Sequence, residues 1–521
     1  MLNLACRNTN KLIREHSREE NIRLGRLFTK KETARLMADT VKLDTGKSAY
    51  TILDPGAGTG ILSAAMIERI CREVPACRQI FVTCYETDER FLPMLADNLE
   101  RIRKKCRHDY DVKLFVTIYN ENYLVDAKNH YTVTFLRTEQ DTFDIILCSP
   151  PSELHLKTSE EAESTGGVTQ VKIHAAYLFA KAAAGHLERG GQLVILLPTV
   201  AATSSSLTPF RRFMHERLSL RSVHLFIGVQ KNPRRAVPLK KQMLLHFTRD
   251  EVREDVAIST STDWGTEGAR EVLSPLPYAF VVDEKDGSLT LPKSREDTSI
   301  VKYITSFPET LSSIGLKIST GRILDARCKD LLFNDAAKGL VPLFRPCTVQ
   351  EGRVEFPGTQ KKNADLPPIV APHQYLAPVS ASLVQRNKNM IFIKRVFSVS
   401  DDRFLNAGVH LAANYPAYPY ISTHNKLLFI DTKNKKGEMS ARFVYGLFAL
   451  LNSTIYDRYL SIVSKSGQLS TKELRDLPLP PAHLIENMGL RLMAMRVTTV
   501  AACDSIVNPT LHITAVEQRD R

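Results

Sequence analysis

A glycine-rich turn between an apolar strand and an apolar helix is the feature that most constrains the fold of this chain. The turn reads Asp-Pro-Gly-Ala-Gly-Thr-Gly over residues 54–60, after the strand-like run 50–53 and before the helix-like run 61–70. Glycines at alternate positions allow the backbone to approach a ligand closely. The segment therefore predicts a ligand-binding strand–turn–helix unit, which by itself suits a dinucleotide binder as well as a methyltransferase.

Strand-like and helix-like runs alternate regularly from this turn to about residue 250. Gly190-Gly191 is predicted to end one of the intervening helices. Such alternation implies βαβ crossovers and a mostly parallel, doubly wound α/β sheet. The further strands are predicted over 79–88, 113–125, 143–152, 192–200, 219–228 and 240–250.

The alternation stops in a polar segment with several glycines and prolines, residues 253–280. A chain of 521 residues is too long for one ordinary core, so two domains are expected. We predict a first domain over 1–255 and a second over 285–521. Short strands, proline-rich turns and helices over 442–463 and 470–475 indicate that the second domain has a mixed α+β fold.

The composition is that of a globular protein, with 43% hydrophobic and 24% charged residues. The sequence shows neither an apolar run long enough for a membrane helix nor a signal-peptide core, so we expect a cytoplasmic protein with no membrane partner. None of the nine cysteines forms a CxxC pair, which argues against a disulfide framework. The net charge of +13 favours a polyanionic partner such as nucleic acid.

Three details around the turn favour S-adenosylmethionine over a dinucleotide. Asp54 ends the first strand, where a carboxylate can meet the cationic end of S-adenosylmethionine and would repel a pyrophosphate. The next strand ends in Glu86, which is placed to accept hydrogen bonds from both ribose hydroxyls. A Pro-Pro pair follows the fourth strand, and a dehydrogenase has no use for one. We therefore predict that Asp54, Glu86, Gly56, Gly58 and Gly60 bind this cofactor.

The Pro-Pro pair lies in the sequence Ser149-Pro150-Pro151-Ser152, beside the predicted cofactor crevice. This loop resembles that of the amino-methylating DNA methyltransferases, which reads Asp, Asn or Ser, then Pro-Pro, then an aromatic residue. The resemblance implies that the side chain of Ser149 and the following backbone carbonyl accept hydrogen bonds from the target amino group. It also implies that both prolines hold that carbonyl in place and that a ring stacks on a flipped base.

The order of the motifs extends the resemblance over roughly residues 20–485. The stretch 24–38 resembles the motif that precedes the glycine turn in the gamma arrangement, where the target-recognition region comes last. Residues 173–199 and the later stretches 341–346, 448–454 and 465–480 are similar to the adenine-specific Eco57I and PstI-type enzymes. The resemblance implies a Rossmann-like methyltransferase sheet followed by a DNA-binding target-recognition domain.

Three more residues enter the expected cofactor site through this resemblance. Phe28 and Thr29 lie in the stretch that precedes the turn, and Asn122 stands where the family often has an acid that contacts the cofactor adenine. An amide can also pair with an adenine edge. Thr29 is in addition predicted to cap the helix that follows it, with Glu32 completing a capping box.

Two further positions depart from the family pattern, beside the mild departure at Asn122. Ser152 replaces the aromatic residue, so another ring covers the base, or activity is reduced, or the chain is a degenerate copy. Tyr123 and Tyr177 are the candidate replacement rings, and an ordinary half-buried tyrosine is the alternative explanation for each. Ser149 replaces the Asn or Asp of the adenine branch, and serine is also common here in cytosine amino-methylating relatives. The sequence therefore indicates the reaction, methylation of an amino group, more clearly than it indicates the target base.

Three basic stretches are candidate DNA contacts. The cations of 231–241 lie in a predicted loop, for which simple solvation is an equal alternative. The stretch 392–404 alternates cations with aromatic residues, and 465–475 contains a predicted helix start near Ser470 whose N-terminus suits a phosphate. The cations of 101–107 are instead predicted to form the solvated end of a helix. The predicted DNA-binding residues are Lys231, Arg234, Arg235, Lys394, Arg395, Lys465 and Gln468.

The leading hypothesis is a site-specific adenine DNA methyltransferase of a restriction–modification system. Such an enzyme would use S-adenosylmethionine and no metal, and it would act on double-stranded DNA. A separately encoded restriction endonuclease is a second candidate partner. Two alternatives stay open: a cytosine amino-methyltransferase, suggested by Ser149, and a catalytically weak DNA-binding relative, suggested by Ser152. RNA or protein methylation fits the long basic C-terminal domain less well, and the sequence has no nuclease motif in a spare domain.

Overall fold

The computed structural model describes residues 1–15, 29–126, 142–150, 155–156, 173–227, 242–262, 270–360, 369–378, 380–395, 403–434, 436–464 and 471–513. The chain divides into two compact units, Met1–Lys293 and Ser294–Arg521. The division falls later than the boundary expected between 255 and 285, because β10 (Ala257–Ser261) and β11 (Arg270–Val272) extend the sheet of the first unit.

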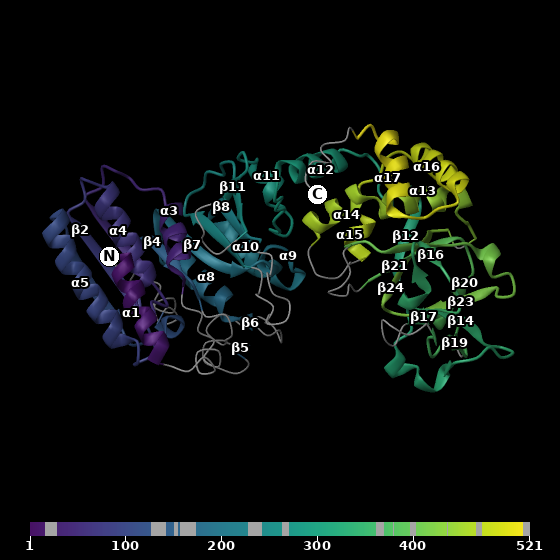
Figure 1. The fold of residues 1–521 in the computed structure, drawn as a ribbon, viewed down its shortest axis with the longest axis horizontal. Coiled ribbons are helices and arrows are strands. Elements are labelled where there is room, and N and C mark those ends of the chain that lie inside the picture. The colour runs from purple at the N-terminus through teal and green to yellow at the C-terminus, as the bar shows by residue number, and fades with distance from the viewer. Residues whose placement is uncertain are drawn as a thin grey trace. The chain divides into compact units, whose positions relative to one another are not determined.

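The first unit is built on a nine-stranded sheet (Figure 1). Its other strands are β1 (Ala49–Asp54), β2 (Gln79–Tyr85), β3 (Lys113–Tyr119), β4 (Phe143–Cys148), β7 (Leu187–Pro198), β8 (Ser219–Phe226) and β9 (Gln242–Thr248). The order is β11-β10-β8-β9-β7-β4-β1-β2-β3. Neighbours from β3 to β7 are parallel, whereas β9 is antiparallel to both β7 and β8. The order reverses between β1 and β4, so the predicted doubly wound sheet is confirmed.

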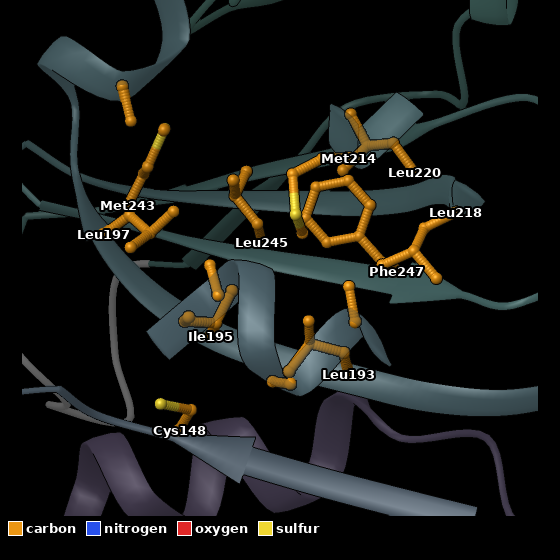
Figure 2. Close-up of a cluster of buried hydrophobic side chains, with 14 of the residues drawn as sticks. Cys148, Leu193, Ile195, Leu197, Met214, Leu218, Leu220, Met243, Leu245 and Phe247 are labelled. Carbon is orange, nitrogen blue, oxygen red and sulfur yellow. The ribbon is translucent and has the colours of Figure 1, made fainter. Parts of the chain in front are cut away.

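Helices cover both faces of this sheet. They are α1 (Leu2–Glu15), α3 (Lys31–Thr40), α4 (Ile61–Glu73), α5 (Leu92–Tyr110), α8 (Ala175–His186), α9 (Val200–Thr203), α10 (Thr208–Arg217) and α11 (Tyr278–Val281). Ile52 of β1 packs in a cluster with α1, α3, α4 and α5, whereas the next residue, Leu53, packs in a cluster with α8 and α10. Figure 2 shows part of the second cluster, with side chains of β7, β8 and β9 and with Met214 of α10 beside Phe247.

Two local predictions for this unit are wrong. The N-cap of α3 is Lys30, without a side-chain hydrogen bond, so Thr29 and Glu32 do not form the predicted capping box. The helix before β7 ends at His186, and Gly190-Gly191 lie inside β7 rather than at the helix end. A Cβ at Gly191 would lie 2.8 Å from the carbonyl oxygen of Phe143, so the close pairing of β7 with β4 requires this glycine.

The second unit is a mixed α+β domain. Its larger sheet has the order β12-β24-β21-β22-β16-β15, and a second sheet has the order β13-β19-β14-β23-β20. The first sheet comprises β12 (Leu316–Thr320), β15 (Val349–Gln350), β16 (Arg353–Val354), β21 (Met390–Lys394), β22 (Ala407–His410) and β24 (Leu427–Thr432). The second comprises β13 (Leu332–Phe333), β14 (Val341–Phe344), β19 (Tyr375–Leu376), β20 (Gln385–Arg386) and β23 (Tyr420–Thr423).

The helices of this unit are α12 (Arg295–Thr305), α13 (Ala441–Asn452), α14 (Thr454–Val463), α15 (Thr471–Arg475), α16 (Ala482–Met495) and α17 (Val500–Thr510). The helix expected over 442–463 is two helices, because Ser453 is extended and its side chain accepts a hydrogen bond from the Tyr456 N–H to cap α14. All nine cysteines are free. Within the described part of the chain, no helix is long and apolar enough to cross a membrane.

Candidate functional site

Three of the predicted site segments meet at one edge of the nine-stranded sheet. Strand β1 pairs in parallel with both β2 and β4, so the carboxyl ends of all three strands lie at the same edge. Asp54 is the last residue of β1, Glu86 follows β2, and Ser149-Pro150 follow β4 directly. This edge includes the point where the strand order reverses, which is where open α/β sheets bind their ligands.

Asp54 is a buried carboxylate, with 1% of its surface exposed. Its Oδ2 accepts hydrogen bonds from the backbone N–H of Ser63, at 3.3 Å, and from the Ser63 hydroxyl, at 2.8 Å. Its Oδ1 is buried and has no hydrogen-bond partner among the residues that the structure describes. Burial raises the pKa of Asp54 to about 6, and the nearby charge of Glu86 adds to the rise, while the hydrogen bonds from Ser63 and a weaker one from the backbone N–H of Gly56 oppose it. A buried carboxylate oxygen that has no hydrogen-bond donor among the described residues suits a cationic N–H donor of a ligand.

The turn after Asp54 has a backbone conformation that glycine adopts readily. Gly58 has φ +54° and Gly60 has φ +81°. A Cβ at Gly60 would lie 2.9 Å from Cδ1 of Leu95 on α5, whereas a Cβ at Gly58 would meet no atom of the described residues within 4 Å. Gly56 is exposed. The turn therefore packs on α5 through Gly60 and leaves open space at Gly58, where a ligand can approach the backbone.

Glu86 holds the other side of this turn. Its Oε2 accepts a hydrogen bond from the Gly58 N–H at 2.8 Å, and its Oε1 accepts one from the Asp88 N–H at 2.8 Å. This carboxylate is predicted from the sequence to bind ribose hydroxyls, and in the structure it also orients the turn. Each carboxylate oxygen has two lone pairs, so these backbone bonds leave it able to accept further donors.

The remaining predicted cofactor residues are placed less directly. Asn122 follows β3, and its Oδ1 accepts a hydrogen bond from the Leu124 N–H at 3.0 Å, at the start of a helical turn over 123–126. Asparagine commonly caps helices in this way, so Asn122 has a local structural role. Thr29 is half-buried just before α3, and Phe28 lies outside the described residues.

The two tyrosines considered as replacement rings are both core residues. Tyr123 is 2% exposed, and its hydroxyl is 2.9 Å from Nδ1 of His186. Tyr177 is 7% exposed, and its ring lies 5.1 Å from that of Phe210, centroid to centroid. Rings buried to this extent do not offer a face on which a base can stack, so the alternative explanation holds for each. Pro151 and Ser152 lie outside the described residues.

Two of the predicted DNA-binding residues are described, both at the end of β21 in the second unit. Lys394 and Arg395 are half-buried, and the backbone N–H of Arg395 donates to the carbonyl of Lys426 at 3.0 Å, which adds a third cation. Arg403, from the same basic stretch, is instead used internally, since its guanidinium donates to the carbonyl of Asn452 at 2.8 Å. Lys231, Arg234, Arg235, Lys465 and Gln468 lie outside the described residues.

Several polar residues that support the turn are not among the residues predicted from the sequence. Ser63 is one of them, and its signal was available: it is a hydroxyl in the first turn of an otherwise apolar helix segment, directly after the glycines. Thr9, Thr59 and Asn98 are also almost fully buried, at 0–1% exposed. Thr9 and Asn98 lie far from the turn in sequence, so local patterns could not connect them with it.

Comparison with known proteins relates about nine-tenths of the chain to type II methyltransferases. The type II methyltransferase M.BsuBI of Bacillus subtilis is 25% identical over 469 residues, which cover 89% of this chain and 89% of the relative. The type II methyltransferase M.PstI of Providencia stuartii is 22% identical over 478 residues, which cover 90% of this chain and 89% of the relative. The resemblance to PstI-type methyltransferases that the motifs indicated is thereby confirmed. No protein-family model matches the chain.

Among solved structures, the chain is similar to the type IIL restriction-modification enzyme MmeI, which was solved in complex with DNA. The TM-score is 0.52 at 12% sequence identity, and the match covers 99% of this chain and 75% of the MmeI chain. Similarity at this level of identity concerns the fold. It agrees with a doubly wound sheet followed by a second, mixed α+β domain.

Proposed function

We propose that this relative of the type II methyltransferases transfers a methyl group from S-adenosylmethionine to the exocyclic amino group of adenine at specific sites in double-stranded DNA. The meeting of Asp54, Glu86 and Ser149-Pro150 at one sheet edge carries this proposal. The relationship to two type II methyltransferases over about nine-tenths of the chain supports a role in restriction–modification. A separately encoded endonuclease would then recognise the same DNA sites.

The residues around the turn fit S-adenosylmethionine. The buried Oδ1 of Asp54, which has no partner among the described residues, suits a cationic amino group, and Glu86 suits vicinal hydroxyls. The space at Gly58, which no described residue fills, lets a ligand reach the backbone. When bound, the cofactor supplies a methyl group on a positively charged sulfur. The residues that we expect to contact it are Phe28, Thr29, Asp54, Gly56, Gly58, Gly60, Glu86 and Asn122.

Ser149 and Pro150 would act on the target base. The Ser149 hydroxyl and the Pro150 carbonyl can both accept hydrogen bonds from an amino group, and together they would fix the direction of its nitrogen lone pair. Accepting these bonds also raises the electron density on the nitrogen. The target base must leave the helical stack to reach this edge of the sheet, and Pro151 and Ser152 would form the rest of its pocket.

The second unit would recognise the DNA sequence, because the gamma arrangement places target recognition after the catalytic motifs. Lys394 and Arg395 in this unit, with Lys465 and Gln468, would contact phosphates. The net charge of +13 supports binding to a polyanion.

Methyl transfer to DNA tests the proposal directly. The full-length protein is incubated with unmethylated genomic DNA and S-adenosylmethionine that carries a tritiated methyl group, and the product nucleosides are separated. N6-methyladenine is the expected product. Labelled N4-methylcytosine would instead show that cytosine is the target base, which is the alternative that Ser149 suggests. Cofactor binding without transfer, on DNA from several sources, would show the catalytically weak relative instead.

Ser152 offers a sharper probe of the substrate half of the site. In the Ser152→Tyr variant we expect the rate of transfer to rise, since base–aromatic stacking contributes about 1–3 kcal/mol per base. A fall in rate would show that the serine belongs to a differently built pocket. Ser152→Ala serves as the matched control, because it changes the residue without adding a ring.

A further inference from the structure

A chain of hydrogen-bonded polar side chains, half-buried at Asn8 and fully buried at Asn98, joins helix α1 to the glycine turn. The Nδ2 group of Asn8 on α1 donates to Oδ1 of Asn98 on α5 at 2.6 Å. The Nδ2 group of Asn98 donates in turn to the backbone carbonyl of Thr59 at 2.9 Å. Thr59 is the residue between Gly58 and Gly60, so two helices reach the middle of the turn through these bonds.

A second connection runs from α1 to the side chain of Thr59. The hydroxyl oxygens of Thr9 and Thr59 are 2.5 Å apart, and the Thr9 hydroxyl also lies 2.8 Å from the carbonyl of Ala5, to which it donates. A hydroxyl has a single proton, so Thr9 must accept from Thr59 in this arrangement. Both the carbonyl and the hydroxyl of Thr59 are therefore held by residues far away in sequence.

These bonds fix peptide planes of the turn. The peptide between Thr59 and Gly60 is held at its carbonyl by Asn98 and at its N–H by the carbonyl of Ala57, at 2.8 Å. The N–H of Gly58 is held by Glu86 on the opposite side. The left-handed conformations of Gly58 and Gly60 are accessible to glycine but not enforced by it, because glycine populates several conformations in the absence of such restraints.

Simple packing does not explain this set of side chains. Thr9, Thr59 and Asn98 are 0–1% exposed and lie among the apolar residues of α1, α4 and α5. Polar groups in such a place are costly unless they are hydrogen-bonded, and apolar residues of similar size would fill the same volume without that requirement. A fully satisfied buried network does, however, select one arrangement of the groups that it joins.

We propose that Asn8, Thr9 and Asn98 are positioning residues for cofactor binding, and that α1 is thus a functional part of the cofactor site. They act through Thr59: they hold the turn in the conformation that presents its backbone and the open space at Gly58 to the ligand. The inference rests on the proposed function, because it concerns the same turn as the S-adenosylmethionine site.

The test measures binding of S-adenosylmethionine and of S-adenosylhomocysteine to the full-length protein by calorimetry. The variants are Thr9→Val, which keeps the side-chain shape but removes the hydroxyl, and Asn98→Leu, which removes both links of the amide. We expect each to weaken binding by about 5- to 20-fold. The KM for S-adenosylmethionine should rise by a similar factor, while kcat at saturating cofactor stays within about twofold. Thr9→Ser, which keeps the hydroxyl, should bind within about twofold of the unchanged protein.

Ile102→Val is the matched control, because Ile102 is buried in the same layer of α5 and takes no part in the polar chain. It should lower the melting temperature without changing cofactor affinity. The proposal is overturned if Thr9→Val and Asn98→Leu lower the melting temperature as Ile102→Val does but bind the cofactor normally. If Asn98→Leu does not fold, Thr9→Val and Asn8→Ala are compared with Ile102→Val in the same way.

The double variant Thr9→Val/Thr59→Val adds a test of the link itself. If the two hydroxyls act as a pair, the double variant binds the cofactor no more weakly than Thr9→Val alone, whereas independent roles would make the two losses add. Unchanged protein that binds neither S-adenosylmethionine nor S-adenosylhomocysteine would overturn the proposed function itself. If instead the unchanged protein and every variant bind the cofactor normally, the proposed function stands and only the positioning role is overturned.

Discussion

The glycine turn of the first unit and the end of β21 in the second unit both gather polar or charged groups at a sheet edge, but the groups are held in different ways. At the turn, Asp54 is 1% exposed and Glu86 accepts two backbone N–H groups at 2.8 Å. At the end of β21, Lys394 and Arg395 are half-buried and joined to the neighbouring strand mainly through backbone bonds.

This difference indicates which kind of ligand each sheet edge is suited to bind. Groups fixed before the ligand arrives lose little conformational freedom on binding, and their bonds gain strength from burial. Such a site binds one small molecule in one orientation. Cations that keep access to water instead contribute modest, salt-dependent attraction to phosphates, which suits a long polyanion. Substitutions at the turn should therefore have large effects on a small ligand, and substitutions at β21 should have small effects on DNA.

The largest effect is expected for Asp54→Asn. The amide removes the negative charge and places an NH2 group near the donors of Ser63 or at the open acceptor position. We expect S-adenosylmethionine to bind about 100-fold more weakly, which corresponds to about 2.7 kcal/mol, within the range for a buried hydrogen bond to a charged group. Calorimetric titration measures this change.

Asp144→Asn is a control for that variant. Asp144 lies at the opposite end of β4 and accepts a hydrogen bond from the Thr51 N–H at 2.9 Å, so its loss disturbs the same sheet away from the turn. The control should lower stability and leave cofactor affinity nearly unchanged. Equal loss of affinity in both variants would show that the sheet as a whole is damaged, and that Asp54 has no special role.

A smaller loss is expected for Glu86→Gln, about 10-fold in cofactor affinity. The glutamine amide can keep one of the two backbone bonds, but its NH2 group must then face the N–H of either Gly58 or Asp88. Glu89→Gln changes an exposed carboxylate in the same segment and should have no effect. A Glu86→Gln protein that binds like the unchanged one would indicate that the turn keeps its shape without this carboxylate.

The binding of S-adenosylmethionine should also depend on pH through Asp54. The pKa of Asp54 in the folded chain is raised from 3.8 to about 6, chiefly by burial. The ionised form therefore costs stability as the pH rises from about 4 to 6, and it is this form that attracts a cationic ligand. Affinity should fall by up to about 10-fold between pH 7 and pH 5 as the carboxylate is protonated.

The Asp54→Asn variant separates this titration from general acid effects. Buried histidines such as His246, whose pKa is lowered to about 3 chiefly by burial, reduce stability below pH 6.5, so the melting temperature is recorded at each pH. The pH dependence of binding between pH 7 and pH 5 should be absent in Asp54→Asn. The same dependence in the variant would assign it to another group.

The same contrast explains how much the sequence could predict. The turn, the doubly wound order and the strand ends at Asp54, Glu86 and Ser149 follow from local patterns, because a strand, its turn and the next helix are adjacent in sequence. The support of the turn does not. Thr9 and Asn98 contact Thr59 from helices that pack against the turn only in the folded first unit. In the local sequence, each looks like an ordinary helix residue.

Two other expectations failed for related reasons. Gly190-Gly191 predict a helix end because glycines end helices more often than they lie within strands, but the approach of β7 to the carbonyl of Phe143 requires a glycine inside the strand. The boundary expected between residues 255 and 285 lies in a polar, glycine-rich segment, and β10 of that segment pairs in parallel with β8 to widen the sheet of the first unit. Both depend on strand pairing, which sequence composition does not reveal.

The smallest effect is expected at the end of β21. Lys394→Ala should weaken DNA binding by about two- to threefold at 150 mM salt and reduce the slope of log affinity against log salt by about one. The matched control is Lys104→Ala on α5, whose side chain is 77% exposed and lies 3.8 Å from Glu100, at a helix end predicted to be merely solvated. Cofactor affinity should stay unchanged in both variants. An equal loss of DNA affinity for Lys104→Ala would mean that overall charge decides binding, whereas a loss confined to Lys394→Ala would identify the end of β21 as a phosphate contact.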